Sequence, residues 1–192
     1  MTELSLIEAC TQNNAAAQRE LYNRFSGLLF GVCYRYAFCK ADAEDMLQEG
    51  FIKIFKRIGS FENKGTFEGW MKKVMVYTCI NYLKKNKKFS DIISLESTYE
   101  LEVKDESIAS KLLGKQVMEC LMMMPIGYRT VINLYAIEGY SHKEIGDMLE
   151  IGESTSRSQY IRGKNLLESI LINKKIIPKT DNRLEWIALL NE

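Results

Sequence analysis

The chain has 192 residues with 46% hydrophobic and 27% charged side chains, and its formal net charge at pH 7 is +1. This composition is normal for a soluble globular protein. The sequence has no run of about twenty apolar residues and no secretory signal at its N-terminus, so we expect a cytoplasmic protein without direct membrane insertion.

Apolar residues recur at helical spacing through most of the first 88 residues. The pattern begins at Leu6 and continues to Tyr36, which predicts helices over this stretch. A further helix is expected from Asp42, because its apolar residues form one stripe that would be buried. The stripe consists of Met46, Leu47, Phe51, Ile54, Phe55 and Ile58.

The outward face of this helix is acidic. At about 100° per residue, Asp45, Gln48, Glu49 and Ile52 fall on one side of it. An acidic face with an isoleucine at its edge suits a protein partner that carries basic residues. An ordinary surface isoleucine without a partner is the alternative.

A loop and a lysine-rich helix come next. Residues 61–66, FENKGT, predict a loop, and a helix is expected over residues 67–88, with a break allowed near Tyr77. Residues 71–90 carry six lysines and no acidic residue, which would attract a polyanion, although a solvated lysine face is the alternative. Single-stranded DNA is a candidate ligand, because aromatic rings stack on unpaired bases and lysines hold the backbone. The side chains concerned are Phe61, Phe67, Trp70, Lys72, Lys73, Tyr77, Tyr82, Lys84 and Lys85, of which the aromatic ones also suit a core.

An acidic segment then interrupts the helical pattern. Residues 89–110 lose the helical period, and residues 91–110 hold six acidic side chains and one basic side chain, so we interpret residues 89–110 as a linker. The helical period returns at Lys111 and stops near Pro125. A helix is expected from Tyr128 to Ile137, closed by Gly139.

Residues 141–167 predict two short helices joined by a tight turn. Ser141 and Glu144 form a capping box, and Ile145, Met148 and Leu149 give the first helix an apolar stripe. The turn contains Gly152, which can adopt unusual backbone angles. The second helix is polar and basic, and such a helix can enter the DNA major groove, whereas an ordinary helical hairpin is the alternative. Its inner side would be Tyr160 or Ile161, with Leu166 and Leu167.

These elements predict an all-α protein, because no alternating run is long enough for a sheet. We expect two small helical domains, residues 1–88 and 111–172, joined by the acidic linker 89–110. Residues 173–192 form a C-terminal tail that we expect to pack on the second domain, with a regulatory latch as the alternative.

Three blocks in this order resemble bacterial sigma factors of the sigma-70 family, specifically the small extracytoplasmic-function (ECF) group. DAEDMLQEGFIKIFK resembles the helix that binds core RNA polymerase. FENKGTFEGWMKKVMVYTCINYLKK resembles the segment that melts and reads the minus-10 promoter element. PIGYRTVINLYAIEGYSHKEIGDMLEIGESTSRSQYIRGKNLL resembles the helix-turn-helix domain that reads the minus-35 element.

The resemblance implies a contact for each block. Asp45, Gln48, Glu49 and Ile52 would meet the clamp region of the largest polymerase subunit. The implied minus-10 residues are Phe61, Trp70, Lys72, Lys73, Tyr77, Thr78, Asn81, Lys84 and Lys85, with a flipped base held by a loop around residues 76–80. The implied minus-35 residues are Ser154, Thr155, Arg157, Ser158, Ile161, Arg162 and Lys164. An anti-sigma factor is a further implied partner.

Several residues depart from the family pattern. Tyr77 stands where a small polar residue is common, and Ser156 replaces a residue that is usually apolar. Gly152 replaces the usual serine cap, with Ser154 as an alternative cap and a later helix start. Gly163 lies inside the second helix, where glycine costs roughly 1 kcal/mol relative to alanine.

The sequence therefore predicts a transcription initiation factor that binds core RNA polymerase and directs it to promoters. The alternative is a stand-alone helix-turn-helix regulator whose first domain senses a signal or dimerises. We expect no enzymatic activity, because no nucleophile and base are paired in the sequence. We also expect no cofactor and no metal, since His142 is the only histidine and the cysteines form no CxxC pair. The five cysteines are expected to be buried free thiols.

Overall fold

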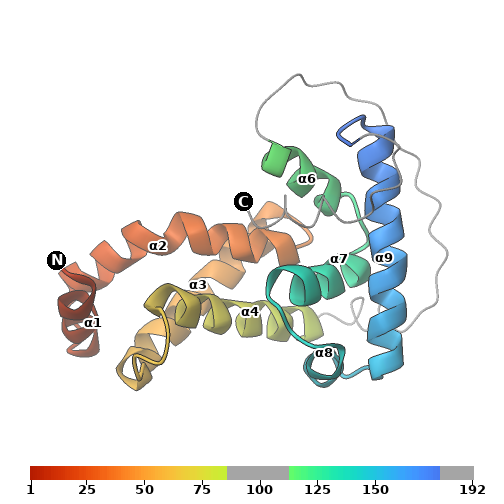
Figure 1. Ribbon diagram of the computed structural model, residues 1–192. Helices are drawn as coiled ribbons and strands as arrows, with labels where there is room; N and C mark the ends of the chain where they lie inside the picture. Colours follow the sequence, from red (N-terminus) through yellow and green to blue (C-terminus); the bar gives the residue numbers. More distant parts are fainter. Residues whose placement is uncertain (86–112, 178–192) are drawn as a thin grey trace. The chain divides into compact units, whose positions relative to one another are not determined.

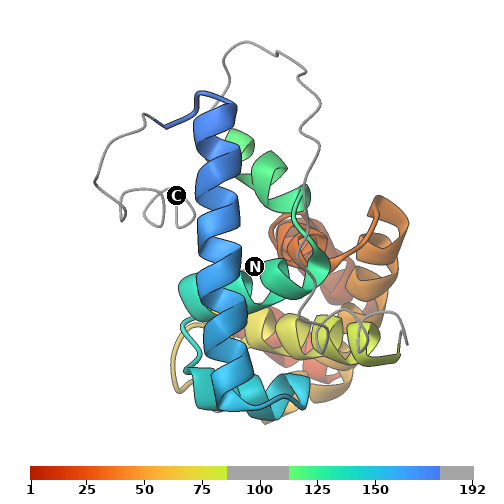
Figure 2. The same cartoon turned by 90° about the vertical axis from the view of Figure 1, so that its right-hand side faces the viewer.

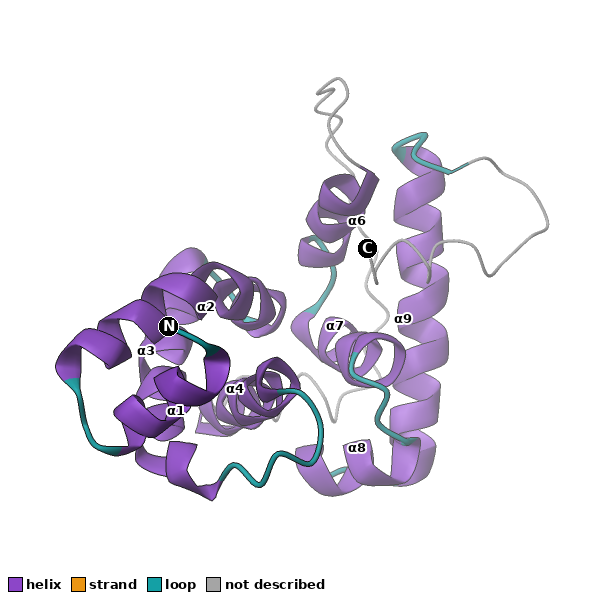
Figure 3. Cartoon of the chain, turned by 60° about the vertical axis from the view of Figure 1, so that its left-hand side comes forward, coloured by secondary structure: helices purple, strands orange, loops and turns teal. Residues whose placement is uncertain are grey.

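The structure is a computed structural model that describes residues 1–85 and 113–177 (Figure 1). Every regular element in these ranges is helical (Figure 3), so the all-α prediction is confirmed. The contacts divide the chain into two units, Met1–Asn86 and Lys87–Glu192. The predicted linker, residues 89–110, and residues 178–192 of the predicted tail lie outside the described residues.

The first unit is built from four α-helices and one short 3₁₀ helix among the described residues. Helix α1 covers Glu3–Thr11, and the Thr2 hydroxyl caps it by accepting from the Ser5 N–H. Helix α2 covers Ala15–Tyr36 and begins at Asn14, whose side chain accepts from the N–H groups of Ala16 and Ala17. These caps satisfy amide donors that have no partner within a helix. The remaining elements are α3 (Lys40–Arg57), the short 3₁₀ helix η1 (Ile58–Ser60) and α4 (Phe67–Lys85).

The core of the first unit lies where α2, α3 and α4 pack against one another. The predicted stripe of α3 is buried, except that Phe55 is only half-buried. Gly50 faces the Met75 thioether so closely that a Cβ atom at this position would overlap it. A side chain at this position would therefore have to displace the buried end of Met75, so glycine suits the packing of α3 on α4.

Helix α4 is continuous, so the predicted break near Tyr77 and the predicted loop at residues 76–80 are both wrong. Val76, Cys79 and Ile80 are buried at helical spacing, and the Thr78 hydroxyl donates to the Val74 carbonyl one turn earlier. The apolar residues of this segment pack the helix against the core, so the segment is helical rather than a loop.

The second unit contains one long helix and several shorter ones (Figure 2). Helix α6 covers Leu113–Met122, and α7 covers Ile126–Ile132 directly after Pro125, two residues before the predicted start. A π-helical segment, η2 (Asn133–Ile137), continues α7, and Gly139 takes a positive φ of 78° close to the predicted end. Helices α8 (His142–Leu149) and α9 (Glu153–Asn173) follow.

Helix α9 contacts α6, α7 and α8 along its length. A buried cluster joins α6, α7 and α9, and includes Leu121, Ile132 and Leu167. Gly163 lies against α7, and a Cβ atom there would be 3.0 Å from Ile132 Cδ1 and 3.1 Å from Tyr128 Cβ. The close approach of two helices explains a glycine that local helix propensity disfavours.

All five cysteines are free, and four are buried as predicted. Cys39 is exposed instead, at the N-cap position of α3. Burial raises the pKa of the Cys10 and Cys120 thiols, so both stay protonated and unreactive. Within residues 1–85 and 113–177, no helix has both the length and the apolar character needed to cross a membrane.

Candidate protein and nucleic-acid interfaces

The outward face of α3 carries the predicted acidic group. Asp45 and Gln48 are exposed, and Ile52 is 53% exposed on the same face. Glu49 is half-buried, and its carboxylate accepts a charged hydrogen bond from Lys53 Nζ at 2.8 Å. Lys85 Nζ of α4 lies 4.0 Å from the same carboxylate oxygen. Three of the four predicted residues are therefore open to a partner, while Glu49 is already held by lysines.

The charge on Glu49 is fixed by its surroundings. The hydrogen bond from Lys53 lowers the pKa of the Glu49 carboxyl below its usual value, and partial burial opposes this shift only in part. The positive charges of Lys53 and Lys85 act in the same direction as the hydrogen bond. Glu49 is thus ionised at neutral pH, and its negative charge is balanced by Lys53.

A tyrosine ties α4 to the first turn of α3. The Tyr82 hydroxyl donates to the Asp42 carboxylate with an oxygen–oxygen distance of 3.0 Å. Burial, together with this carboxylate, raises the pKa of Tyr82 to about 12, so the hydroxyl remains a donor at neutral pH. This bond adds a polar contact between α3 and α4 to their apolar packing.

A hollow opens where the loop after η1 meets α4. Its volume is about 300 Å³, and the rings of Phe61, Phe67 and Trp70 pack together beside it at centroid distances of 5.2 to 5.8 Å. Phe61 and Trp70 are half-buried and line the hollow. Their rings are therefore held by packing and still have surface exposed to a ligand. The other lining residues are Ser60, Glu62, Lys64, Gly65, Thr66, Gly69 and Lys73.

Sequence reasoning passed over Lys64, Thr66 and Gly69 at this hollow. The FENKGT loop, bounded by aromatic residues on both sides, was the signal that could have found them. Gly65 has a φ of 110°, which only glycine adopts without strain, so the loop bends at this point.

The other predicted minus-10 residues divide between two sides of α4. Spacings of three and four place Trp70, Lys73, Tyr77, Asn81 and Lys84 in one outward row, with Tyr77 50% exposed. Lys72 is turned toward Glu68, with a nitrogen–oxygen distance of 2.7 Å. Thr78 is 1% exposed, so the prediction that it contacts DNA does not fit this fold.

The junction of α8 and α9 has the predicted cap and an unexpected turn. The Ser141 hydroxyl accepts from the Glu144 N–H, and the Glu144 carboxylate accepts from the Ser141 N–H at 2.8 Å, which confirms the capping box. The left-handed residue is Glu150, with a φ of 59°, rather than Gly152, with a φ of −66°. Gly152 is the N-cap of α9, so the alternative cap at Ser154 is wrong.

Gly146 explains why the turn closes so tightly. A Cβ atom at this position would be 2.8 Å from the Ile151 carbonyl oxygen, and that backbone atom has little freedom to move. The Ile151 N–H donates to the Gly146 carbonyl at 3.0 Å, which holds the turn against α8. The direction of α9 therefore depends on glycine at residue 146.

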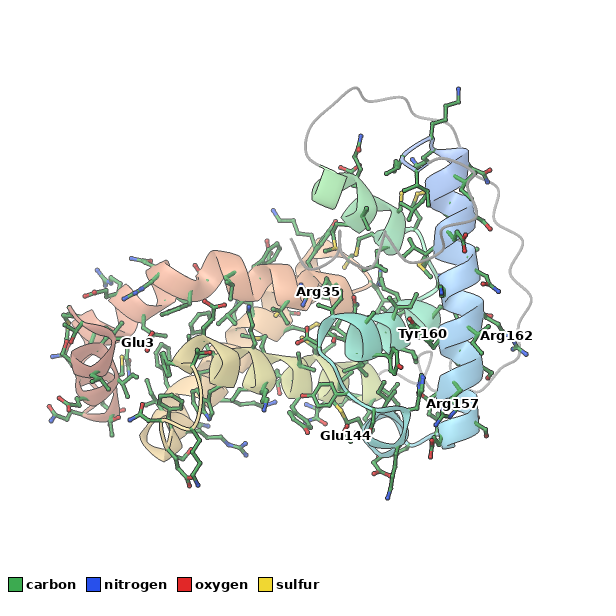
Figure 4. The ribbon with its side chains drawn as sticks, in the orientation of Figure 1. Glu3, Arg35, Glu144, Arg157, Tyr160 and Arg162 are labelled. Carbon is green, nitrogen blue, oxygen red and sulfur yellow. The ribbon has the colours of Figure 1, made fainter. Side chains whose placement is uncertain are left out.

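The outer face of α9 carries most of the predicted minus-35 residues (Figure 4). Ser154, Arg157, Ile161 and Arg162 are exposed, whereas Thr155, Ser158 and Lys164 are half-buried at the edges of this face. Ile161 is 57% exposed, while Tyr160 is half-buried on the side facing α7. Of the two alternatives for the inner side, Tyr160 is therefore correct. Arg157 forms an ion pair with Glu153 one turn earlier.

Ser156 is fully buried, and a polar partner accounts for its departure from the apolar pattern. Its hydroxyl oxygen lies 3.0 Å from His142 Nδ1, and His142 is 8% exposed. The imidazole stacks on the Tyr135 ring with a centroid distance of 4.3 Å and a tilt of 9°. A buried hydrogen bond thus joins the starts of α8 and α9, and it satisfies both polar groups.

We expect acid to weaken the second unit through His142. Burial lowers the pKa of this imidazole, the charge of Arg157 lowers it further, and Glu153 opposes both. The folded state then binds fewer protons than the unfolded state, whose histidine pKa is about 6.5. This stabilisation is present above about pH 6.5 and is lost as the pH falls toward the depressed folded pKa.

Urea unfolding of the full chain at pH 7.5 and 5.5, followed on the amide signals of Ile145 and Leu167, tests this expectation. The free energy of unfolding of the second unit should fall by up to about 1.4 kcal/mol per pH unit in the wild type. In His142→Gln the fall should disappear. An equal fall in the variant would contradict the assignment to His142, because carboxyl groups titrate at lower pH.

Comparison with known proteins gives a family for each unit. Residues 21–89 match Sigma-70 region 2, and residues 114–167 match Sigma-70, region 4. The ECF RNA polymerase sigma-E factor of Haemophilus influenzae is 25% identical over 180 residues, which is 88% of this chain and 95% of that protein. The ECF RNA polymerase sigma factor SigW of Bacillus subtilis is 26% identical over 176 residues, with 86% and 94% covered.

One similar solved structure is the sigma factor RpoE with the anti-sigma factor NepR from Bartonella quintana. It is 18% identical, with a TM-score of 0.48, and the match covers 80% of this chain and 95% of that chain.

The chain belongs to the sigma-70 family, because each of its two helical units matches one of that family's regions. Its relatives are ECF sigma factors that it matches over nearly their whole length, so it is an ECF sigma factor. It acts in transcription initiation by directing RNA polymerase to promoter DNA, and the alternative of a stand-alone regulator is not favoured. Members of this family regulate transcription without being enzymes, which fits the prediction made from the sequence.

Proposed function

We propose that the chain binds core RNA polymerase through α3 and reads the minus-10 and minus-35 elements through α4 and α9. The observation that carries this proposal is the separation of charge in the first unit. Asp45 and Gln48 lie on the outward face of α3, whereas aromatic and basic side chains follow the outward row of α4. One small domain can therefore hold a protein and DNA at the same time, and we place its action in the cytoplasm.

The polymerase contact would be made by the clamp region of the largest subunit. Asp45, Gln48 and Ile52 offer exposed surface to it, and Glu49, paired with Lys53, lies beside them. Basic residues of the clamp would face this group, since complementary charges set orientation and association rate. On the family resemblance alone, we also propose an anti-sigma factor as a further partner.

The minus-10 contact would use the outward row of α4 and the hollow beside it. A flipped base costs a few kcal/mol to unstack. Stacking on an aromatic ring returns about 1–3 kcal/mol per base, and the half-buried Phe61 and Trp70 provide such rings at the hollow. We therefore propose the hollow, rather than residues 76–80, as the place of the flipped base. Lys73, Lys84 and Lys85 would hold the DNA backbone nearby.

The minus-35 contact would use the outer face of α9. Arg157, Ser158, Ile161 and Arg162 would face the major groove, where guanidinium and hydroxyl groups reach base edges. Thr155 and Lys164 at the edges of this face, and Ser154 in the first turn of α9, would hold phosphates, which position the helix without reading sequence.

Transcription with purified core RNA polymerase on a promoter library tests the proposal. Addition of the chain should give initiation at defined start sites that share two sequence elements. A stand-alone regulator would bind DNA fragments but would not confer initiation on the core enzyme. Failure to initiate at any defined site would overturn the proposal.

Arg157→Ala should weaken recognition of the minus-35 element by about 1–3 kcal/mol if the guanidinium binds a guanine in two places. Run-off transcription from templates with single minus-35 substitutions measures this loss. At one minus-35 position, the variant should no longer prefer one base pair over the others. Lys175→Gln is the control, because it removes one positive charge from an exposed side chain just beyond α9. Unchanged preference at every minus-35 position in Arg157→Ala would show that the register of α9 is different.

A further inference from the structure

The start of α9 is held by polar rather than apolar side chains. Within residues 153–159 the buried side chains are Ser156 and Gln159, and the next buried side chain along the helix is Leu167. Gly152, the N-cap of α9, has no side-chain oxygen that could accept from the amides of the first turn. The end of α9 that begins the proposed minus-35 face therefore depends on polar contacts for its position.

One of these contacts joins α9 to the first residue of α8. His142 Nδ1 lies 3.0 Å from the Ser156 hydroxyl oxygen. The imidazole stacks on the Tyr135 ring of η2, and its centroid lies 5.7 Å from that of the Tyr160 ring of α9. The centroids of Tyr135 and Tyr160 are themselves 4.6 Å apart. We call Tyr135, His142, Ser156 and Tyr160 the histidine cluster, which ties η2, α8 and α9 together.

The imidazole of the histidine cluster is neutral at neutral pH. Burial lowers the pKa of His142, the charge of Arg157 lowers it further, and Glu153 opposes both. The neutral ring and the Ser156 hydroxyl share one hydrogen bond. In one tautomer the Nδ1–H donates to the hydroxyl oxygen, and in the other the hydroxyl donates to Nδ1.

We propose that His142 is a positioning residue for minus-35 recognition, which acts through Ser156 on the rotation of α9. This inference rests on the proposed function of α9. Ser156 directly precedes Arg157, and successive helical residues point about 100° apart, so a fixed inward direction of Ser156 fixes the outward direction of Arg157. Binding side chains must be held within about 10–20° of their productive geometry. A loose first turn would therefore lose base preference, while phosphate contacts, which read no sequence, would suffer less.

Ser156→Ala removes the hydrogen bond without weakening the helix, because alanine has the higher helix propensity. The full chain is assembled with core RNA polymerase, and run-off transcription at pH 7.5 compares a template that carries the preferred minus-35 element with singly substituted templates. The ratio between preferred and substituted templates should fall by about 2–10-fold, as expected for one hydrogen bond. A loss of folded protein would lower transcription from every template alike and leave this ratio unchanged.

Two substitutions of His142 separate the hydrogen bond from the packing of the ring. The amide of His142→Asn can replace Nδ1 as a hydrogen-bonding group, whereas His142→Leu offers only apolar packing. His142→Asn should keep the ratio within about 2-fold of the wild type, and His142→Leu should lower it as far as Ser156→Ala does. The double variant should lose no more than either single variant, because both remove the same bond.

Ser169→Ala is the matched control. It makes the same change in α9 at an exposed serine, whose hydroxyl donates to the Asn165 carbonyl within the helix. The minus-35 ratio of this variant should equal that of the wild type.

Three results would overturn the positioning role of His142. These are wild-type ratios in both Ser156→Ala and His142→Leu, a ratio in His142→Asn as low as that in His142→Leu, and additive losses in the double variant. A wild type that initiates with no minus-35 preference would overturn the proposed function of α9, and this inference with it.

Discussion

Asp45→Arg is expected to weaken binding to core RNA polymerase by several kcal/mol, which corresponds to a loss of more than about 100-fold. Asp45 is exposed on the outward face of α3, so the change leaves the core of the first unit intact. The new arginine would face the basic residues that we expect on the polymerase clamp. Like charges brought together at an interface repel, and the attraction of the original pair is lost in addition.

Fluorescence anisotropy of the labelled chain titrated with core polymerase measures this change, at low and at moderate salt concentration. The difference between wild type and variant should shrink as salt increases, because salt screens exposed charges. Minus-35 recognition should be unaffected, since α9 belongs to the other unit.

Glu44→Arg is the matched control for this prediction. Glu44 is also exposed on α3, but it is turned about 100° from Asp45 and its carboxylate lies 3.5 Å from Lys40 Nζ. The control makes the same change of charge next to the proposed surface and should have a much smaller effect. Equal losses in both variants would indicate a general effect of charge, and full affinity in Asp45→Arg would remove Asp45 from the contact.

Gly163→Val is expected to destabilise the second unit by about 3 kcal/mol. The first added carbon would be 3.0 Å from Ile132 Cδ1 and 3.1 Å from Tyr128 Cβ, and the Tyr128 atom is anchored to the α7 backbone. Two further methyl groups cannot fit unless α9 moves away from α7. The gain in helix propensity over glycine is only a fraction of a kcal/mol for a β-branched residue, so overpacking should decide the outcome.

The measurement is urea unfolding of the full chain, followed on the amide signals of Leu167 in the second unit and Leu29 in the first. Only the Leu167 transition should shift. Minus-35 recognition should weaken too, because α9 would change its position on α7.

Gly31→Ala is the control for the helix propensity of glycine. Gly31 lies in α2, and a Cβ atom there would meet nothing within 4 Å. This variant should be more stable than the wild type by about 0.5–1 kcal/mol. Stability of Gly163→Val equal to or above the wild type would show that α7 can yield, and that residue 163 does not set the helix distance.

The amino-acid sequence by itself determined the features that depend on neighbours within one helical turn. The capping box of Ser141 and Glu144, the buried stripe of α3 and the exposed face with Asp45 and Ile52 all follow from spacings of three and four residues. The order of the three sigma-factor blocks is also a property of the sequence alone. Such signals are local, so no knowledge of packing is needed to read them.

Tertiary structure decided which faces are buried and which distant residues meet. Thr78 is polar and sits in a lysine-rich helix, yet packing of α4 on its neighbours buries it. The sequence allowed a break near Tyr77, whereas α4 is continuous there because its buried residues pack against the core. The hollow by Trp70 forms where the loop after η1 meets α4, so it depends on how the two segments pack.

Contacts between distant residues also account for two residues that depart from the family pattern. Ser156 has no local explanation, but the fold brings it to His142, fourteen residues earlier. Gly163 carries a cost in an isolated helix, and only the approach of α7 makes a side chain there more costly still. Tyr22 meets Phe51 across two helices, at a sequence distance that no helical period connects. Contacts of this kind depend on how whole helices pack, and the physical terms that set helix packing are spread over many residues.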